Sequence, residues 1–158
     1  MDVEERIITL LEEEEVDYKR LTHEPVYTSK QASEVRGVPL NSGVKAMVLE
    51  RDGDGLILAL VPADHRVDLD AVGKSVECEV KLASPEEVLE VTGCEIGSVP
   101  PFGHKNPLET YLDPGVMDNE IVNFNAGKHD VSVELSARDL PRCVKSSGSS
   151  LTIKKIRK

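Results

Sequence analysis

Residues Val44 to Pro62 read VKAMVLERDGDGLILALVP, which is two apolar runs separated by the turn sequence Asp-Gly-Asp-Gly. Asp-Gly pairs adopt positive φ angles at little cost, and they favour the tight turns that connect antiparallel strands. The stretch therefore predicts a β-hairpin, and this hairpin is the clearest element of the chain.

Helices and strands are mixed on both sides of the hairpin. The spacing of apolar residues and the presence of capping residues predict helices at 2–15, 28–37, 65–75 and 84–93, with a helical turn at 136–144. Strand candidates occupy 77–83, 108–117, 120–127 and 131–136. These elements do not alternate as regular βαβ units, so we predict an α+β fold with one curved, largely antiparallel sheet.

The composition is typical of one globular domain. The chain has 158 residues, of which 39% are hydrophobic and 30% are charged, so we predict a single domain over residues 1–145 and a basic extension over residues 146–158. The three cysteines are widely spaced and suggest neither a zinc site nor a disulfide framework. The acidic N-terminus is unlike a signal peptide, and no apolar run is long enough to span a membrane. A cytoplasmic protein without a membrane partner is therefore expected.

The charge is distributed unevenly. A net charge of −10 argues against a protein that binds nucleic acid non-specifically over a broad basic face. Six lysine or arginine residues and no acidic residue lie between Arg142 and Lys158, which leaves a charge of −16 on the remainder. This segment is either a local docking site for a phosphate-rich ligand or a solvated terminus.

Lys45 is the only polar residue of the run VKAMVL, at the start of the predicted hairpin. A lysine held against an apolar sheet keeps its charge only if it reaches an anion or water. It is therefore either an edge-strand lysine that discourages pairing between sheets or a cation directed at a phosphate or carbonyl of a ligand.

The stretch TGCEIGSVPPFGHKNP, from Thr92 to Pro107, predicts a rigid loop, called the proline loop below. Its two consecutive prolines cannot lie within a helix or a central strand, and its glycines allow backbone N–H groups to approach a ligand closely. Such N–H groups can bind a carbonyl or stabilise an oxyanion without a catalytic side chain. The simpler interpretation is a tight connection between a helix and a strand.

The stretch NFNAGKHD, from Asn123 to Asp130, ends a predicted strand in a turn and places His129 beside Asp130. Adjacent strand residues point to opposite faces, so Asp130 is not expected to orient the imidazole, and a solvated histidine is the simpler interpretation. The chain has no histidines at metal-binding spacing, no phosphate-binding glycine loop and no nucleophile elbow. No metal and no cofactor are expected.

Five stretches occur in an order that resembles the YbaK family, the editing-domain relatives of bacterial prolyl-tRNA synthetase that deacylate mischarged tRNA in trans. They run from His23 to Leu140 and read HEPVYTSKQASEVRG, GVKAMVL, LALVPADHRVDLDAVG, TGCEIGSVPPFG with LETYLD, and NFNAGKHDVSVELSARDL. The resemblance implies a curved sheet or partial barrel flanked by helices. It also implies a trans-editing enzyme that hydrolyses the ester of mischarged tRNA, such as Cys- or Ala-tRNA(Pro).

The resemblance also implies roles for particular residues. Lys45 matches the essential lysine of the family and Gly97 to Pro101 matches its Gly-x-x-x-Pro loop, so Lys45 and Gly97 are expected to be catalytic. Substrate contacts are expected from the loop and the turn, at Ser98, Pro101, Phe102, Gly103, Asn125, Gly127 and His129. The basic end of the chain lies outside the matched region, and its charge leads us to expect that it binds tRNA through Lys154, Lys155, Arg157 and Lys158. The expected partner is the aminoacylated 3′ end of tRNA, and an aminoacyl-tRNA synthetase is a further candidate.

Two parts of the sequence depart from the family pattern. Ala46 follows the lysine where members often carry a polar residue, and residues 131–133 read Val-Ser-Val where some cysteine-specific relatives place an acidic residue. The amino acid that is removed is therefore not predicted. The competing hypothesis is a non-catalytic module that binds an aminoacyl-tRNA end or a protein partner and regulates translation.

Overall fold

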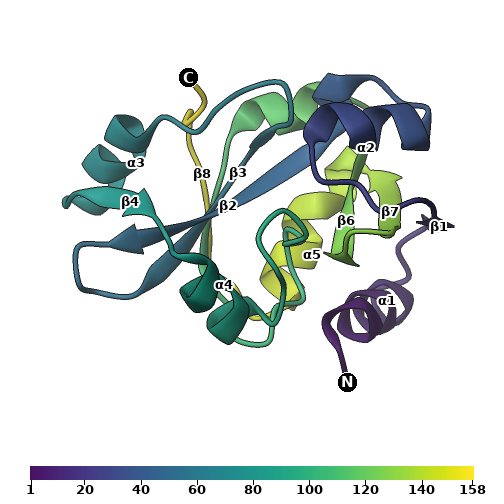
Figure 1. Cartoon of the computed structure of the whole chain (residues 1–158), viewed down its shortest axis with the longest axis horizontal. Coiled ribbons are helices and arrows are strands. Elements are labelled where there is room, and N and C mark those ends of the chain that lie inside the picture. Colours follow the sequence, from purple (N-terminus) through teal and green to yellow (C-terminus); the bar gives the residue numbers. More distant parts are fainter.

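The computed structural model describes all 158 residues and confirms the α+β class (Figure 1). The helices are α1 (Val3–Glu13), α2 (Ser29–Arg36), α3 (Leu69–Val76), α4 (Pro85–Thr92) and α5 (Leu140–Ser146), with 3-10 helices η1 (Leu40–Ser42), η2 (Pro114–Asp118) and η3 (Ala137–Asp139). The strands are β1 (Tyr18–Thr22), β2 (Val44–Arg51), β3 (Leu56–Pro62), β4 (Val80–Leu82), β5 (Glu109–Leu112), β6 (Ile121–Lys128), β7 (Val131–Ser136) and β8 (Leu151–Ile153). None of the helices combines the length and the apolar character that crossing a membrane requires.

The predicted hairpin is confirmed and forms the centre of a five-stranded sheet with the order β4-β2-β3-β5-β8. β2 and β3 pair in antiparallel fashion, with Val44 opposite Pro62, and the turn between them holds Gly53 and Gly55 at positive φ. β5 pairs with β3 in parallel, and β8 pairs with β5 in parallel. Parallel neighbours need a long connection, and the segment from β3 to β5 carries α3, β4, α4 and the proline loop.

The strands divide between two sheets where the sequence suggested one. β6 turns directly back into β7, and β7 then pairs with β1, so these strands form a separate antiparallel sheet with the order β1-β7-β6. The sequence did not predict β1, because its side chains are exposed or half-buried and give no clear alternation of polar and apolar residues. The two sheets are linked by a bridge between Gly43 and Asn123.

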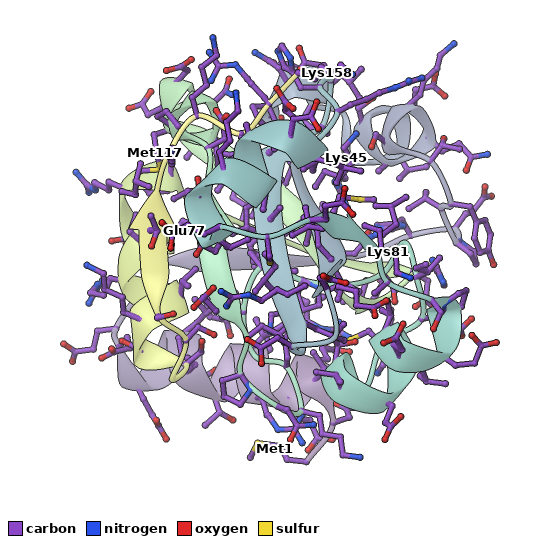
Figure 2. All side chains as sticks on the ribbon, turned by 90° about the vertical axis from the view of Figure 1, so that its left-hand side faces the viewer. Met1, Lys45, Glu77, Lys81, Met117 and Lys158 are labelled. Carbon is purple, nitrogen blue, oxygen red and sulfur yellow. The ribbon has the colours of Figure 1, made fainter.

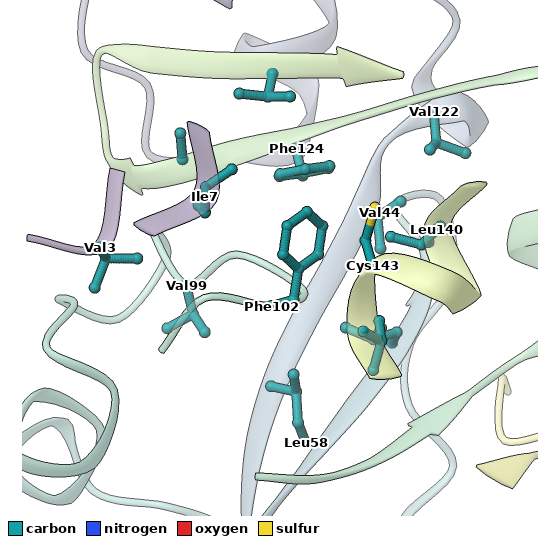
Figure 3. Packing of buried hydrophobic residues seen from close by; sticks show 14 of the residues in the cluster. Val3, Ile7, Val44, Leu58, Val99, Phe102, Val122, Phe124, Leu140 and Cys143 are labelled. Atoms are coloured by element: carbon teal, nitrogen blue, oxygen red, sulfur yellow. The ribbon is translucent and has the colours of Figure 1, made fainter. Parts of the chain in front are cut away.

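The main hydrophobic core surrounds the proline loop (Figure 3). Phe102 is fully buried and contacts Phe124 edge to face, with 5.6 Å between the ring centroids. Gly103 follows at a φ of +89°, and a Cβ there would lie 2.8 Å from Cγ1 of Ile7 in α1. The first helix therefore packs directly on the loop, and the loop owes its rigidity to the core as well as to its prolines.

β3 is buried on both faces because a smaller core covers the other side of the five-stranded sheet. Leu58 and Leu60 face the main core, whereas Ile57 faces the smaller core beneath α3. Ile156, close to the end of the chain, is fully buried in the smaller core. This double burial explains the continuous apolar run of the strand.

The C-terminal segment lies against the five-stranded sheet. Beyond β8, the N–H groups of Ile156 and Arg157 each donate to the buried carboxylate of Asp113 at 2.8 Å, and the Arg157 guanidinium forms an ion pair with the same carboxylate. Burial by itself would raise the pKa of Asp113, but these hydrogen bonds and that from Gly115 outweigh it and hold the pKa below its usual value. Residues 151–157 are therefore part of the packed structure.

The ends of α2 and α4 are capped as the sequence predicts. Thr28 and Ser84 accept hydrogen bonds from the first turns of the two helices, and Gly37 and Gly93 end them in the left-handed region. Because Gly37 ends α2, Arg36 is the last residue of that helix.

Candidate active site at the junction of the two sheets

A cavity of about 310 Å³ lies where the two sheets separate. β4 pairs with β2 only from Leu49 to Arg51, so residues 44–48 of β2 lack a β4 neighbour on that edge. Residues of α2, of the proline loop and of β6 line the space beside this edge. A cavity of this size suits a small ligand or the end of a larger one.

The cavity wall is mostly apolar and contains no acidic side chain. Of its 23 residues, 14 are hydrophobic, and the two charged ones are Arg36 and Lys45. The chain has 29 aspartates and glutamates, so their absence from this wall leaves a local excess of positive charge. The cavity is electrostatically suited to a group that carries or develops negative charge.

Lys45 extends from the uncovered part of β2 and lines both this cavity and a second one described below. Its side chain is half-buried, and its ammonium takes part in none of the ion pairs of the chain. Burial lowers the pKa of Lys45, the charge of Arg66 lowers it further, and Asp64 opposes both. A partly desolvated cation without a partner favours the ligand-binding interpretation over edge protection.

Gly97 lies at the cavity with a φ of +87°, which side chains rarely adopt. Its carbonyl accepts a 2.7 Å hydrogen bond from the side-chain amide of Asn125. The N–H groups of Gly97 and Val99, two residues of the wall, donate to no backbone acceptor. Free N–H donors in a fixed loop can bind a carbonyl oxygen or an oxyanion.

Arg36 is the candidate that sequence reasoning missed. Its guanidinium donates to Ser132 Oγ at 2.8 Å, to Asn123 Oδ1 at 2.8 Å and to Asn125 Oδ1 at 2.7 Å. None of these acceptors is a carboxylate, and burial lowers the pKa of Arg36 to about 10. The partners lie at least 87 positions away in the sequence, so the quoted stretch that contains Arg36 does not reveal its contacts.

The structure brings three of the residues expected at the site, Lys45, Gly97 and Asn125, together around the cavity. His129 lies beside the wall without lining the space. Its ring centroid is 4.6 Å from that of Tyr27, and its Cε1 is 3.6 Å from the point that a Cβ on Gly97 would occupy. His129 therefore contacts wall residues and does not itself line the cavity.

The other residues expected to contact substrate do not line the cavity; these are Ser98, Pro101, Phe102, Gly103 and Gly127. Phe102 and Gly103 are buried in the main core. The Ser98 hydroxyl donates to the carbonyl of Glu95 at 2.7 Å, and Gly127 packs against Val3 of α1. Their contacts shape the loop and the turn, and α1 packs against both at Gly103 and Gly127.

A second cavity, of about 580 Å³, shares Lys45 with the first and is also lined by Arg66 and Lys158. Figure 2 shows Lys45 and Lys158 at the same end of the molecule. A third cavity shares Lys158 with the second and adds Lys74 and Lys154. Basic side chains thus continue from the first cavity along one side of α3, although Asp68 and Asp70 lie among them.

The four basic residues expected to bind tRNA have different environments. Lys154 and Lys158 line the cavities beside α3, and Lys155 is exposed away from them. Arg157 is half-buried and bound to Asp113. Its guanidinium is therefore occupied within the fold, whereas the ammonium groups of Lys154 and Lys158 are available.

Other titratable groups near the proline loop have structural roles. His104 is buried, burial lowers its pKa to about 4, and its Nε2 lies 2.6 Å from the carbonyl of Pro100. Burial raises the pKa of Cys94 and of Cys143 to about 11, so both thiols stay protonated at neutral pH. No group of three or more His, Cys, Asp or Glu side chains is placed to hold a metal ion.

The fold and the site define a class of protein, a single-domain α+β protein with a cavity free of acidic side chains where its two sheets separate. Residues 23–143 match the family model of the aminoacyl-tRNA editing domain. The chain belongs to the aminoacyl-tRNA editing domain family. The family predicted from the sequence is confirmed, and so is the class of enzyme, a hydrolase of the aminoacyl-tRNA editing type.

Known relatives agree with this assignment. The Multifunctional Ser/Thr-tRNA deacylase ProXp-y of Escherichia coli K12 is 38% identical over 143 residues, which cover 87% of this chain and 86% of the relative. The Prolyl-tRNA editing protein ProX of Acetoanaerobium sticklandii is 27% identical and covers 95% of both chains. The chain also matches 21% of the proline–tRNA ligase of Bacillus licheniformis, at 32% identity.

A solved structure described as that of a candidate trans-editing enzyme for prolyl tRNA synthetase has the same fold. Its TM-score is 0.82 at 27% identity, and the match covers 100% of this chain and 98% of that one. The match includes the C-terminal segment that the family model leaves out.

Proposed function

We propose that the first cavity binds the aminoacyl end of mischarged tRNA and that the protein hydrolyses the ester there. The observation that carries the proposal is one acid-free cavity that combines the unpartnered ammonium of Lys45 with the free N–H groups of Gly97 and Val99. An aminoacyl ester is already activated, so positioning and stabilisation of the oxyanion are enough to accelerate its hydrolysis. Membership of the editing family supports the same substrate class.

Hydrolysis begins with the attack of water on the ester carbonyl carbon. The N–H groups of Gly97 and Val99 hold the carbonyl oxygen as it becomes an oxyanion, and Lys45 adds positive charge beside it. Collapse of the tetrahedral intermediate breaks the bond between the carbonyl carbon and the ribose oxygen, which takes up a proton derived from the attacking water. The products are the free amino acid and a tRNA with a free terminal hydroxyl.

The cavity of about 310 Å³ has to hold the aminoacyl group together with the ribose that carries it, which favours small aminoacyl groups. Its mixed wall, with 14 hydrophobic residues and hydroxyl groups that include Ser29, suits short side chains with or without a hydroxyl. Alanine, cysteine, serine and threonine are therefore the candidate amino acids, and the last two are those in the name of the E. coli relative. A size filter distinguishes neighbours by only about 1–3 kcal/mol per methylene, so several of them can be substrates.

We infer that the second cavity receives phosphates of the tRNA acceptor strand. It adjoins the first through Lys45 and offers Arg66 and Lys158, and Lys154 follows in the third cavity. The protein as a whole has a charge of −10, so tRNA must associate through such a local positive surface. The similarity to proline–tRNA ligases makes prolyl-tRNA synthetase a candidate partner of this protein. Co-purification of the protein with the synthetase tests the association.

The test is release of amino acid from tRNA charged with alanine, cysteine, serine or threonine, with and without EDTA. The wild-type protein is expected to deacylate at least one of them in either condition. Lys45→Ala is expected to lower the rate by about 10²-fold, as loss of one oxyanion-stabilising group does. It should leave thermal unfolding unchanged, because a half-buried lysine leaves no core cavity. The matched control is Lys81→Ala, because the ammonium of Lys81 is exposed and pairs with Glu50.

Two results would contradict this proposal. Binding of charged tRNA without release of amino acid would favour the non-catalytic module. A wild-type rate for folded Lys45→Ala would return Lys45 to the role of an edge-strand lysine.

A further inference from the structure

Arg36 joins separate segments of the chain beside the cavity. It is the last residue of α2, and its acceptors are Asn123 and Asn125 on β6 and Ser132 on β7. Ser132 is in turn 2.6 Å from Nε2 of His23, ahead of α2. A half-buried guanidinium held only by neutral acceptors is costly to desolvate. Packing a helix end does not require this desolvation cost, so the arrangement points to a role for Arg36 at the site.

One branch of hydrogen bonds leads from Arg36 to the proline loop. Nη2 of Arg36 donates to Oδ1 of Asn125 at 2.7 Å, and Nδ2 of Asn125 donates to the carbonyl of Gly97 at 2.7 Å. A guanidinium can only donate and a carbonyl can only accept, so the Asn125 amide has one possible orientation. Holding the Gly97 carbonyl fixes the peptide plane between Gly97 and Ser98, which lies between the free N–H groups of Gly97 and Val99.

A second branch leads from Arg36 to the start of β2. Nη1 of Arg36 donates to Oδ1 of Asn123 at 2.8 Å, and Nδ2 of Asn123 donates to Oγ of Ser42 at 2.8 Å. The Ser42 hydroxyl donates to the carbonyl of Pro39 at 2.6 Å. Ser42 ends η1 and lies three positions before Lys45. The branch therefore fixes the point at which the strand that carries Lys45 begins.

We propose that Arg36 is a positioning residue for hydrolysis, which directs the N–H donors of the Gly97 loop through Asn125 and holds the strand of Lys45 through Asn123. This inference rests on the proposed function, because it concerns the two groups that hold the ester. A planar guanidinium can donate to acceptors on two sides at once in a fixed geometry, whereas the ammonium of a lysine cannot. One side chain thereby sets the distance between the two groups.

The sharpest test replaces the asparagine of each branch by aspartate and compares the two variants. Asn125→Asp keeps an acceptor for Arg36 but removes the donor to the Gly97 carbonyl, which then faces a carboxylate oxygen. Asn123→Asp places the same carboxylate against the same guanidinium, but its neighbour Ser42 is a hydroxyl that can rotate from the Pro39 carbonyl and donate to the new carboxylate. Both variants give Arg36 a charged partner, so neither is expected to unfold the protein.

The measurements are single-turnover deacylation at increasing protein concentration and thermal unfolding. We expect Asn125→Asp to lower the saturating rate by about 10²-fold, the cost of a misplaced reacting group. Its half-saturating concentration should change by less than about threefold, because the interaction is used in the transition state. The saturating rate of Asn123→Asp should remain about tenfold higher than that of Asn125→Asp.

Arg36→Lys tests the guanidinium itself. A lysine replaces the fixed fork of donors by one rotating ammonium, so the saturating rate should fall about as far as in Asn125→Asp. The combination of Arg36→Lys with Asn125→Asp should lose little more than the worse single variant, because both break the same chain of hydrogen bonds. The matched control is Arg20→Lys, whose arginine forms an exposed ion pair with Glu4.

The outcomes separate this inference from the proposed function. If the wild-type protein releases no amino acid from any charged tRNA, both fail. If the wild type is active and the Arg36 and Asn125 variants keep its saturating rate, the positioning role fails and the proposed function stands. Equal losses in the two aspartate variants, or losses that simply follow the unfolding temperature, would also overturn it. If the losses of saturating rate in Arg36→Lys and Asn125→Asp multiply in the double variant, the two residues act independently, and the proposed series of hydrogen bonds through Asn125 fails.

Discussion

Lys45 interacts with charges of both signs, Arg66 and Asp64, at the boundary of the first two cavities. Burial and Arg66 both lower its pKa, and Asp64 opposes them. Arg66→Gln removes one of the two lowering influences, so the pKa of Lys45 is expected to rise, whereas Asp64→Asn should make it fall further. Titration of the lysine side-chain signals by NMR measures both shifts, and Lys45→Arg identifies the signal.

The ammonium of Lys81 is the internal reference for this titration, because it is exposed and pairs with Glu50. Shifts of the Lys45 pKa in the two stated directions would show that its charge interacts with Arg66 and Asp64. Identical titration curves in the wild type and both variants would show instead that water screens Lys45 from its neighbours.

At the scale of the element, the proline loop depends on a neutral histidine. His104 is buried, its Nδ1 has no hydrogen-bond partner, and its pKa is lowered from 6.5 to about 4. The unfolded chain binds the proton more readily, so His104 makes the free energy of unfolding fall as the pH falls from 6.5 towards 4, by about 1 kcal/mol per pH unit at most. His104→Gln can still donate to Pro100 and should remove this slope. Denaturant unfolding at several pH values measures it.

The comparison between wild type and His104→Gln cancels the effect of carboxylates that titrate in the same range, because both proteins contain them. Parallel stability curves for the two proteins between pH 6.5 and pH 4 would mean that protonated His104 is tolerated in the folded loop.

At the scale of the whole molecule, the C-terminal segment closes the smaller core. Ile156 is fully buried there, and the adjoining N–H groups bind the carboxylate of Asp113. Ile156→Ala is therefore expected to lower the free energy of unfolding by about 2–5 kcal/mol, the usual cost of such a truncation in a core. Denaturant unfolding measures this. A loss within experimental error would mean that the segment is only loosely attached.

Lys158→Ala is the matched control in the same segment, because it removes an exposed charge and no core contact. Stability should stay unchanged, whereas affinity for whole tRNA should fall and the slope of log K against log salt should flatten by about 0.7–0.9 for one lost phosphate contact. An unchanged slope would remove Lys158 from the proposed path of the acceptor strand.

The sequence by itself determined the features that depend on neighbouring residues. The hairpin between Val44 and Pro62 follows from its turn and its apolar runs, and the limits of α2 and α4 follow from their caps, because turn and cap geometry involve residues only a few positions apart. Ordered motifs also identified the family, and they named Lys45 and Gly97, which lie at one cavity.

Only the tertiary structure decided how distant segments meet. The division into two sheets, and with it the open edge of β2, depends on the pairing of β1 with β7. Phe102 faces the core and not a ligand because α1 packs on its loop. Arg36 became a candidate through partners at least 87 positions away. Periodicity and motifs report the local chain, whereas a cavity and its hydrogen bonds are formed by segments that the fold alone brings together.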